Sequence, residues 1–383
     1  MGGGNLNTPM SLSTLRMSLW QGCTRLLTGK RPRLARVTDI SSMTERMALL
    51  RLHRMHSREF VMTLMVGRLE SGGKTMIKEI AYENKDEWLS LRKGYIGGSD
   101  AGAVVGLNPY KSAYSLWAEK TGKLPEFEGN TITRVGSYLE ELVAQMFTEE
   151  TGKKVRKKNR ILVNEDYPFA CADVDRLIVG EKALLEIKTT NSPVATKKFK
   201  NGEYPEAWYC QMTHYLAVTG LEKAYLAVLI ECREFKIFEL ERDEEEIEAL
   251  MDAEKNFWNL VKTDQPPVAD GMASTSEALT AIYPQSNDET VDLFGYLNDL
   301  VQYMSLTAQI KALEGQKDEV ANKVKAFLGD AGKGENERYR VSWTTSERKS
   351  LDTKRLAQDH PEIDLNEYYK VSTSRTFRVT EKN

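Results

Sequence analysis

The sequence predicts a mixed α/β protein of the α+β kind. We expect a mixed central sheet flanked by helices, then a long C-terminal helix and a small β-hairpin. The 383 residues are 41% hydrophobic and 28% charged, which is typical of a globular chain. Residues 76–264 alternate between stretches with helical and with strand periodicity, and residues 291–328 carry apolar side chains at helical spacing. These observations together support this fold class.

Residues 76–264 are expected to form one mixed domain, with the order helices, three strands, helix, two strands, helix. The N-terminal helices are expected at residues 86–92, 101–105, 112–121 and 131–151, the last two ending at Gly122 and Gly152. The strands are expected at residues 160–164, 169–179, 183–189, 223–231 and 233–240. The two remaining helices are expected at residues 205–219 and 243–261.

Three further segments surround this domain. Residues 1–75 are a basic extension with 12 Lys and Arg against 4 Asp and Glu, which we expect to be disordered or not native. In the second case Met76 is the true start, because Gly72-Gly73 just before it could be encoded by a ribosome-binding sequence. Residues 265–289 are rich in Ser, Thr and Asp and are expected to be a linker.

The C-terminal region, residues 290–383, is expected to be helical with a hairpin. The apolar spacing over residues 291–328 predicts a long helix or a helical hairpin. Strand-like runs follow at residues 339–344 and 373–379, around a short helix.

Composition excludes several classes of protein. A net charge of −3 excludes a strongly basic protein that binds DNA over its whole surface, but not one with a local basic groove. The longest apolar run, residues 224–230, is too short to cross a bilayer. The four cysteines lie far apart without a CxxC pair, which argues against a disulfide framework or a zinc site and fits a reducing cytoplasm.

The chemistry is expected on the third predicted strand. Alternate strand residues share a face, so Glu186 and Lys188 point one way while Leu185 and Ile187 point into the core. A hairpin with the preceding strand would bring Asp175 beside Glu186, and two adjacent carboxylates favour Mg²⁺. A neighbouring lysine can orient or deprotonate the attacking water, or stabilise negative charge. The alternative is an exposed strand edge with a cross-strand ion pair.

The long helix at residues 131–151 adds a third carboxylate. Glu140 shares a face with the apolar residues Val143 and Phe147, whereas Glu141 lies on the polar face. Because an unpaired carboxylate on a buried face is costly, Glu140 should have a partner. A metal ion would serve, and the alternative is an ion pair with a nearby Lys or Arg.

Other polar groups are expected nearby. Gln211 lies on the same helical face as Met212 and Tyr215, so it either reaches a site or is satisfied by the backbone. Arg92 and Ser99 flank a glycine-rich turn, where a guanidinium and helix N–H groups can bind phosphate. The alternative for this turn is an ordinary capped helix start.

These segments resemble the YqaJ-type viral recombinase family, which comprises phage-encoded relatives of lambda exonuclease within the PD-(D/E)xK nuclease superfamily. The resemblance covers about residues 85–262. The matching segments, which occur in the family's order, are residues 92–101, 136–140, 174–176 with 185–190, and 211–215.

The resemblance implies a restriction-endonuclease-like core and a role for each matched residue. Asp175, Glu186 and the main-chain carbonyl of Ile187 would bind metal, and Glu140 would help to bind a second ion. Lys188 would activate or position the water. The ions would be Mg²⁺ or Mn²⁺, with two in each site.

The resemblance also assigns the DNA contacts. Arg92 and Ser99 would hold a phosphate at the DNA end, while Gln211 and Tyr215 would line the site. Lambda exonuclease has a serine two residues before the metal aspartate, where this chain has Asp173, so a third carboxylate would add to metal binding or weaken the phosphate contact. The basic run at residues 153–160 is a further candidate for DNA binding, and otherwise a solvated turn.

The implied function is Mg²⁺-dependent degradation of linear duplex DNA from the 5′ end, leaving a 3′ strand for recombination by annealing. The implied partners are DNA ends, a phage single-strand annealing protein and further copies of the chain in a ring such as a trimer, without a membrane. The expected location is the cytoplasm of a bacterial host, with a phage or prophage origin. One rival is a structure- or sequence-specific endonuclease on the same fold. The other is an inactive DNA-binding scaffold.

Overall fold

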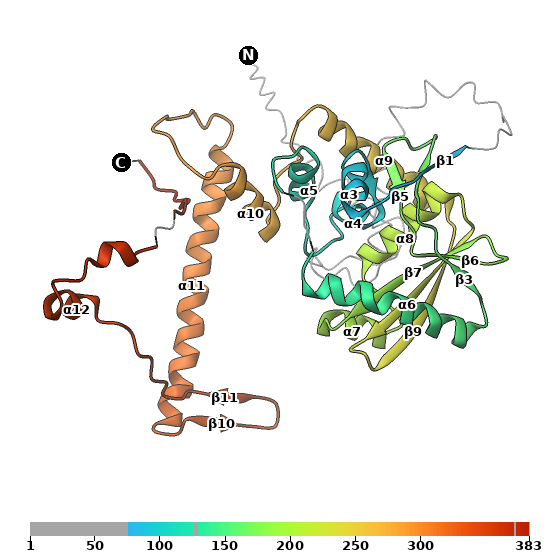
Figure 1. Cartoon of the computed structure of the whole chain (residues 1–383). Helices are drawn as coiled ribbons and strands as arrows, with labels where there is room; N and C mark the ends of the chain where they lie inside the picture. Colours follow the sequence, from blue (N-terminus) through green and yellow to red (C-terminus); the bar gives the residue numbers. More distant parts are fainter. Residues whose placement is uncertain (1–75, 126–128, 371–372, 383) are drawn as a thin grey trace, which may run out of the picture. The chain divides into compact units, whose positions relative to one another are not determined.

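The computed structural model describes residues 76–125, 129–370 and 373–382, so the prediction for residues 1–75 lies outside the described part of the chain. The chain divides into two compact units, the first reaching Ala278 and the second starting at Leu279. Figure 1 shows a mixed sheet flanked by helices in the first unit and one long helix in the second. The fold class predicted from the sequence is therefore confirmed.

A five-stranded mixed sheet forms the centre of the first unit. Its order is β3 (Val155–Arg156), β6 (Arg176–Ile178), β7 (Ala183–Thr190), β8 (Lys223–Ile230) and β9 (Glu234–Glu241). Strands β6 and β7 pair antiparallel, β7 and β8 pair parallel, and β9 returns antiparallel to β8. The parallel step needs a crossover, which α7 (Pro193–Lys200) and α8 (Glu206–Thr219) supply.

A smaller four-stranded sheet lies beside it. Its order is β1 (Ile77–Ile80), β4 (Ile161–Asn164), β5 (Ala170–Ala172) and β2 (Ile96–Gly97). Strand β2 runs parallel to β5 and leads directly into α4 (Gly98–Val104). The glycine-rich turn is thereby fixed next to the end of β5.

Helices cover both sheets. The remaining helices of this unit are α3 (Lys85–Lys93), α5 (Ala113–Lys120), α6 (Thr131–Thr151), α9 (Glu244–Lys262) and the first part of α10 (Ala273–Ile282), which continues past Ala278. Helix α6 packs on β7, where Val143 and Phe147 join Leu185 and Ile187 in one buried cluster. Helix α8 is buried on every side from Tyr209 to Thr219, so it lies in the interior of the unit rather than in a surface layer.

The structure corrects two predicted segments of the first unit. The strand expected over residues 169–179 is two strands, β5 and β6, because residues 173–175 interrupt the strand conformation. The linker expected at residues 265–289 contains α10, where Thr275 is buried and donates to Ser112 Oγ at 2.7 Å. A composition rich in Ser and Thr is typical of a loop. Here hydroxyl side chains hydrogen-bond to the domain, so the segment forms a packed helix instead.

The longest element of the second unit is a single helix, α11 (Leu297–Leu328), rather than a helical hairpin. The hairpin β10 (Lys333–Glu335) with β11 (Arg340–Ser342) follows, then α12 (Thr353–Asp359) and a 3₁₀ turn at Leu365–Tyr368. The strand expected at residues 373–379 is wrong, because this segment pairs with no strand in the described structure. No helix in the described ranges is long and apolar enough to cross a membrane.

Candidate active site

Two carboxylates from adjacent strands meet at the centre of the site. The β6–β7 register pairs Arg176 with Leu185, so the preceding residue, Asp175, lies opposite Glu186. The Oδ2 atom of Asp175 accepts the main-chain N–H of Ile187 at 2.7 Å. The hairpin predicted from the sequence therefore forms and brings the two carboxyl groups together.

Burial and mutual repulsion disfavour the negative charge on both carboxyl groups, and a bound cation would relieve this. Burial raises the pKa of both carboxyls, and the charge of Glu186 helps to raise the pKa of Asp175 well above its usual value. The Nζ atom of Lys188 lies 2.7 Å from Glu186 Oε1, and its positive charge opposes the rise in the pKa of Glu186. Burial disfavours the charge on Lys188, but Glu186 and Asp175 outweigh it and raise its pKa, so Lys188 is held as a cation.

The residues present fit a hard divalent cation. The Oε2 atom of Glu186 is buried and has no hydrogen-bond partner among the described residues, which is costly for a carboxylate oxygen. Carboxylate oxygens are the ligands that Mg²⁺ prefers, and Mg²⁺ usually keeps several waters as well. No three His, Cys, Asp or Glu side chains of the described ranges group together as a metal cage. Further ligands would thus be water or a main-chain oxygen, such as that of Ile187.

Glu140 has a protein partner in this structure. The buried guanidinium of Arg176 donates to Glu140, and also to Glu141 at 3.1 Å and to the main-chain oxygen of Asp175 at 2.7 Å. The ion pair considered as the alternative from sequence is thus the one that forms. Glu140 still lies near the centre, since its charge contributes to the raised pKa of Asp175 and of Glu186.

A pocket of about 200 Å³ collects every predicted site residue except Glu140. Its lining is Trp88, Arg92, Gly97, Gly98, Ser99, Cys171, Asp173, Asp175, Glu186, Ile187, Lys188, Gln211 and Tyr215. The Nε2 atom of Gln211 donates to Glu186 Oε1 at 2.8 Å and to Tyr215 Oη at 3.1 Å. Gln211 therefore reaches the carboxylate and is not satisfied by backbone, and it orients Glu186.

A second group in the pocket is built around an indole ring that sequence reasoning missed. The Arg92 guanidinium lies 4.6 Å from the centroid of the Trp88 ring and donates to Ser99 Oγ at 2.9 Å. The Nε1 atom of Trp88 donates to Asp173 at 2.6 Å. The signal was present, because Trp88 precedes Arg92 by four residues on one helical face. Asp173 thus fixes the ring beneath Arg92.

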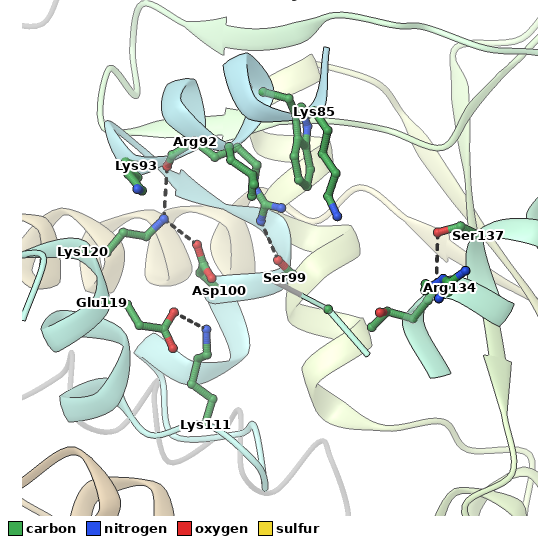
Figure 2. Close-up of a pocket in the computed structure, with 14 residues that line it drawn as sticks. Lys85, Arg92, Lys93, Ser99, Asp100, Lys111, Glu119, Lys120, Arg134 and Ser137 are labelled. Atoms are coloured by element: carbon green, nitrogen blue, oxygen red, sulfur yellow. Dashed lines mark hydrogen bonds and ion pairs between the residues drawn. The ribbon is translucent and has the colours of Figure 1, made fainter. Parts of the chain in front are cut away.

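A larger basic pocket of about 460 Å³ adjoins this one and shares Trp88, Arg92 and Ser99 with it. Figure 2 shows that its labelled basic residues come from several elements, with Arg134, near the start of α6, set apart from the others. These basic residues are Lys85, Arg92, Lys93, Lys111, Lys120 and Arg134. Two of them, Lys120 and Lys111, form ion pairs within the pocket, with Asp100 at 2.9 Å and with Glu119 at 2.7 Å.

The basic run at residues 153–160 forms ion pairs with nearby carboxylates. Lys153 pairs with Glu181, and Lys158 pairs with Glu79. These carboxylates offset much of the charge that the sequence alone attributes to the run. The larger basic pocket combines residues distant in sequence, so sequence reasoning did not find it.

A family model described as a YqaJ-like viral recombinase domain matches residues 87–222. The chain is 40% identical over 301 residues to the uncharacterized protein YqaJ of Bacillus subtilis (strain 168), covering 77% of this chain and 93% of that protein.

Solved structures similar to the chain include two exonucleases. An alkaline exonuclease from Laribacter hongkongensis (LHK-Exo) matches with a TM-score of 0.42 and 20% identity, over 47% of this chain and 94% of that one. A phage-related exonuclease from Haemophilus somnus 129PT matches with a TM-score of 0.36 and 14% identity, over 44% of this chain and 96% of that one.

Proposed function

Because the chain belongs to the YqaJ-like viral recombinase family, we propose that its pocket is the active site of a DNA exonuclease. The enzyme would be Mg²⁺-dependent and would degrade linear duplex DNA from the 5′ end. The remaining 3′ strand would serve recombination by annealing. The observation that carries this proposal is the meeting of Asp175, Glu186, Lys188 and Gln211 in one pocket beside a basic one.

Phosphodiester hydrolysis places growing negative charge on the phosphate, and the positive groups of the pocket would stabilise that charge. A divalent cation held by Asp175, Glu186 and the Ile187 carbonyl would supply Lewis-acid polarisation there. Lys188 is held as a cation, so we assign it to positioning the attacking water and stabilising charge rather than to removing a proton. Gln211 keeps Glu186 in its orientation through the 2.8 Å hydrogen bond.

A second Mg²⁺ or Mn²⁺ would involve Glu140. To bind it, Glu140 would have to weaken its ion pair with Arg176. We therefore propose that the second ion binds more weakly than the first. Its binding would be favoured when a DNA phosphate brings further negative charge to the pocket.

The DNA end would be held by the group around Trp88. Arg92, fixed by the indole ring and by Ser99, would bind a terminal phosphate, and Tyr215 would line the same pocket. Because Asp173 is engaged by Trp88, we assign it to holding the ring in place rather than to metal binding.

The proposed assembly and cellular setting are those that the family resemblance implies. We propose that the enzyme acts in the bacterial cytoplasm, is of phage or prophage origin, and works with a single-strand annealing protein. A ring of several copies, such as a trimer, would enclose the duplex and allow processive degradation.

The test compares linear duplex DNA carrying 5′-phosphates with covalently closed circular DNA, in Mg²⁺ and in EDTA. The variant is Lys188→Ala, and Lys236→Ala is the matched control because Lys236 forms a similar Glu-x-Lys ion pair on β9, at 3.1 Å. We expect Mg²⁺-dependent loss of the linear DNA alone, abolished only by Lys188→Ala. Cutting of the circle would support the endonuclease, and DNA binding without cleavage would support the scaffold.

A further inference from the structure

A third pocket, of about 550 Å³, opens beside the candidate active site. It shares Ser99, Lys188 and Gln211 with the smaller pocket that holds the two carboxylates, so the two pockets adjoin. Its other walls come from the loop at residues 106–110, the end of β7, and the starts of α7 and α8. All of these residues belong to the first unit. The roles assigned above make no use of this space, which we call the side pocket.

Two aromatic side chains line the side pocket. Trp208, on α8, stacks on Phe199 with ring centroids 5.9 Å apart and ring planes at 29°, so its orientation is fixed. Tyr110 is 78% exposed, but its loop is held, because Asn108 Oδ1 accepts the main-chain N–H groups of Tyr110 at 2.9 Å and of Lys111 at 3.2 Å. Aromatic rings held in this way are the surfaces on which nucleobases stack.

The polar groups of the side pocket bond to one another or to the main chain. Lys198 forms an ion pair with Glu206, so their charges offset each other. Thr190 Oγ1 accepts the main-chain N–H of Ser192 at 3.1 Å, and the Ser192 side chain caps the start of α7. A base in the side pocket would therefore be held mainly through its faces, which all four bases present alike.

The residues that border the side pocket indicate which nucleotide would reach it. In the proposed function, Ser99 and Arg92 hold the terminal phosphate, whereas Lys188 and Gln211 lie at the centre where the next phosphate is cleaved. The terminal nucleoside connects these two phosphates. Because the side pocket borders both Ser99 and the pair Lys188 and Gln211, it lies alongside that nucleoside.

We propose that the side pocket receives the base of the 5′-terminal nucleotide once this base has left its pairing partner, with Tyr110 and Trp208 stacking on it. The inference rests on the proposed exonuclease function. A volume of about 550 Å³ lies within the range of pockets that bind small molecules. Taking a base out of the duplex costs stacking and pairing energy, and stacking on the two rings offsets part of that cost.

The experiment uses the full chain and two 5′-phosphorylated duplexes, whose terminal nucleotide carries a base in one and is an abasic analogue in the other. The kcat/KM for release of this first nucleotide in Mg²⁺ is measured on both, and each protein is described by the ratio of the two values. Comparing this ratio between proteins cancels any effect of the DNA end alone. Tyr110→Ala and Trp208→Ala should each lower the ratio at least ~5-fold, since a protein aromatic ring contributes about 5- to 150-fold per stacked base.

Two further variants separate stacking from a general effect on the fold. Trp208→Phe keeps an aromatic ring and should keep most of the ratio. Trp258→Ala is the matched control, because Trp258 is a half-buried tryptophan on α9 that does not line the side pocket, and it should leave the ratio unchanged. Because Tyr110 is exposed, Tyr110→Ala gives a result even where Trp208→Ala fails to fold.

The outcomes distinguish this inference from the proposed function. If wild type releases nucleotides but Tyr110→Ala and Trp208→Ala slow both duplexes by the same factor, the rings do not contact the terminal base and the inference is overturned. It is also overturned if the ratio responds only when the abasic analogue is the second nucleotide, which would assign the side pocket to that base. If wild type cleaves neither duplex in Mg²⁺, the proposed function fails, and this inference fails with it.

Discussion

A buried ion pair behind the active site should make the stability of this protein fall as the pH rises. The Nδ1 atom of His214 lies 2.9 and 3.0 Å from the two carboxylate oxygens of Glu254, and its Nε2 atom lies 2.9 Å from the main-chain oxygen of Cys171. Both ring nitrogens therefore face acceptors. A neutral imidazole has only one N–H, so the buried pair must hold one additional proton.

The pKa directions agree with this geometry. Burial opposes the charge on His214, but Glu254 outweighs it and raises the histidine pKa. Burial raises the pKa of Glu254, against the attraction of His214. A group whose pKa is raised by folding contributes stability below its unfolded pKa, about 6.5 for histidine, and that stability is lost as pH rises through the folded pKa.

The size of the change in the free energy of unfolding is set by the additional proton that the pair binds in the folded state. Between the unfolded pKa of histidine and the raised pKa of the folded state, the folded state binds up to one more proton than the unfolded state, so the free energy of unfolding falls by up to about 1.4 kcal/mol per pH unit. For a domain of this size, that corresponds to about 3–5 °C in Tm per pH unit.

The perturbation is Glu254→Gln, because a glutamine amide can donate to Nδ1 and leave His214 neutral. Thermal unfolding of both proteins is measured from pH 6.5 to 8.5 at constant ionic strength. As the pH rises, the Tm of the wild type should fall relative to that of Glu254→Gln by up to about 3–5 °C per pH unit. Parallel curves would refute the reasoning, because they would show that the pair holds no extra proton.

Three more predictions test the pocket and its surroundings. Mg²⁺ at 100 times its Kd should stabilise the wild type by about 2.7 kcal/mol, and differential scanning fluorimetry should show no such shift for Asp175→Asn. Gly98→Ala should destabilise the fold by about 1–3 kcal/mol in urea unfolding, because its Cβ would lie 2.4 Å from the Tyr215 ring; an unchanged midpoint would contradict this packing. Arg134→Ala should lower the salt slope of DNA binding, measured by fluorescence anisotropy in EDTA, by about 1, whereas an unchanged slope would remove Arg134 from the DNA contact.

The parts of the site that could be predicted from the sequence are those fixed by local periodicity. Strand alternation placed Glu186 and Lys188 on one face, and the short hairpin brought Asp175 to them. Helical spacing likewise placed Gln211 on the face that reaches Glu186.

The rest depends on contacts between residues far apart in the chain. The choice of Arg176 as partner for Glu140 is decided by how α6 lies on the five-stranded sheet, which no local pattern encodes. The bond from Trp88 to Asp173 joins two residues 85 positions apart. The α10 helix was missed because its composition is that of a loop, and only its packing through Thr275 shows that it is ordered.

The measurement that tests the central claim most directly is the rate of Mg²⁺-dependent nucleotide release from linear duplex DNA by Glu186→Gln. Glu234→Gln is the control, because Glu234 belongs to the similar Glu-x-Lys pair on β9. The buried carboxylate pair as catalytic centre predicts a fall of at least ~10³-fold for Glu186→Gln and a change within about twofold for the control. A Glu186→Gln variant that keeps more than about a tenth of the wild-type rate would contradict this assignment of the active site.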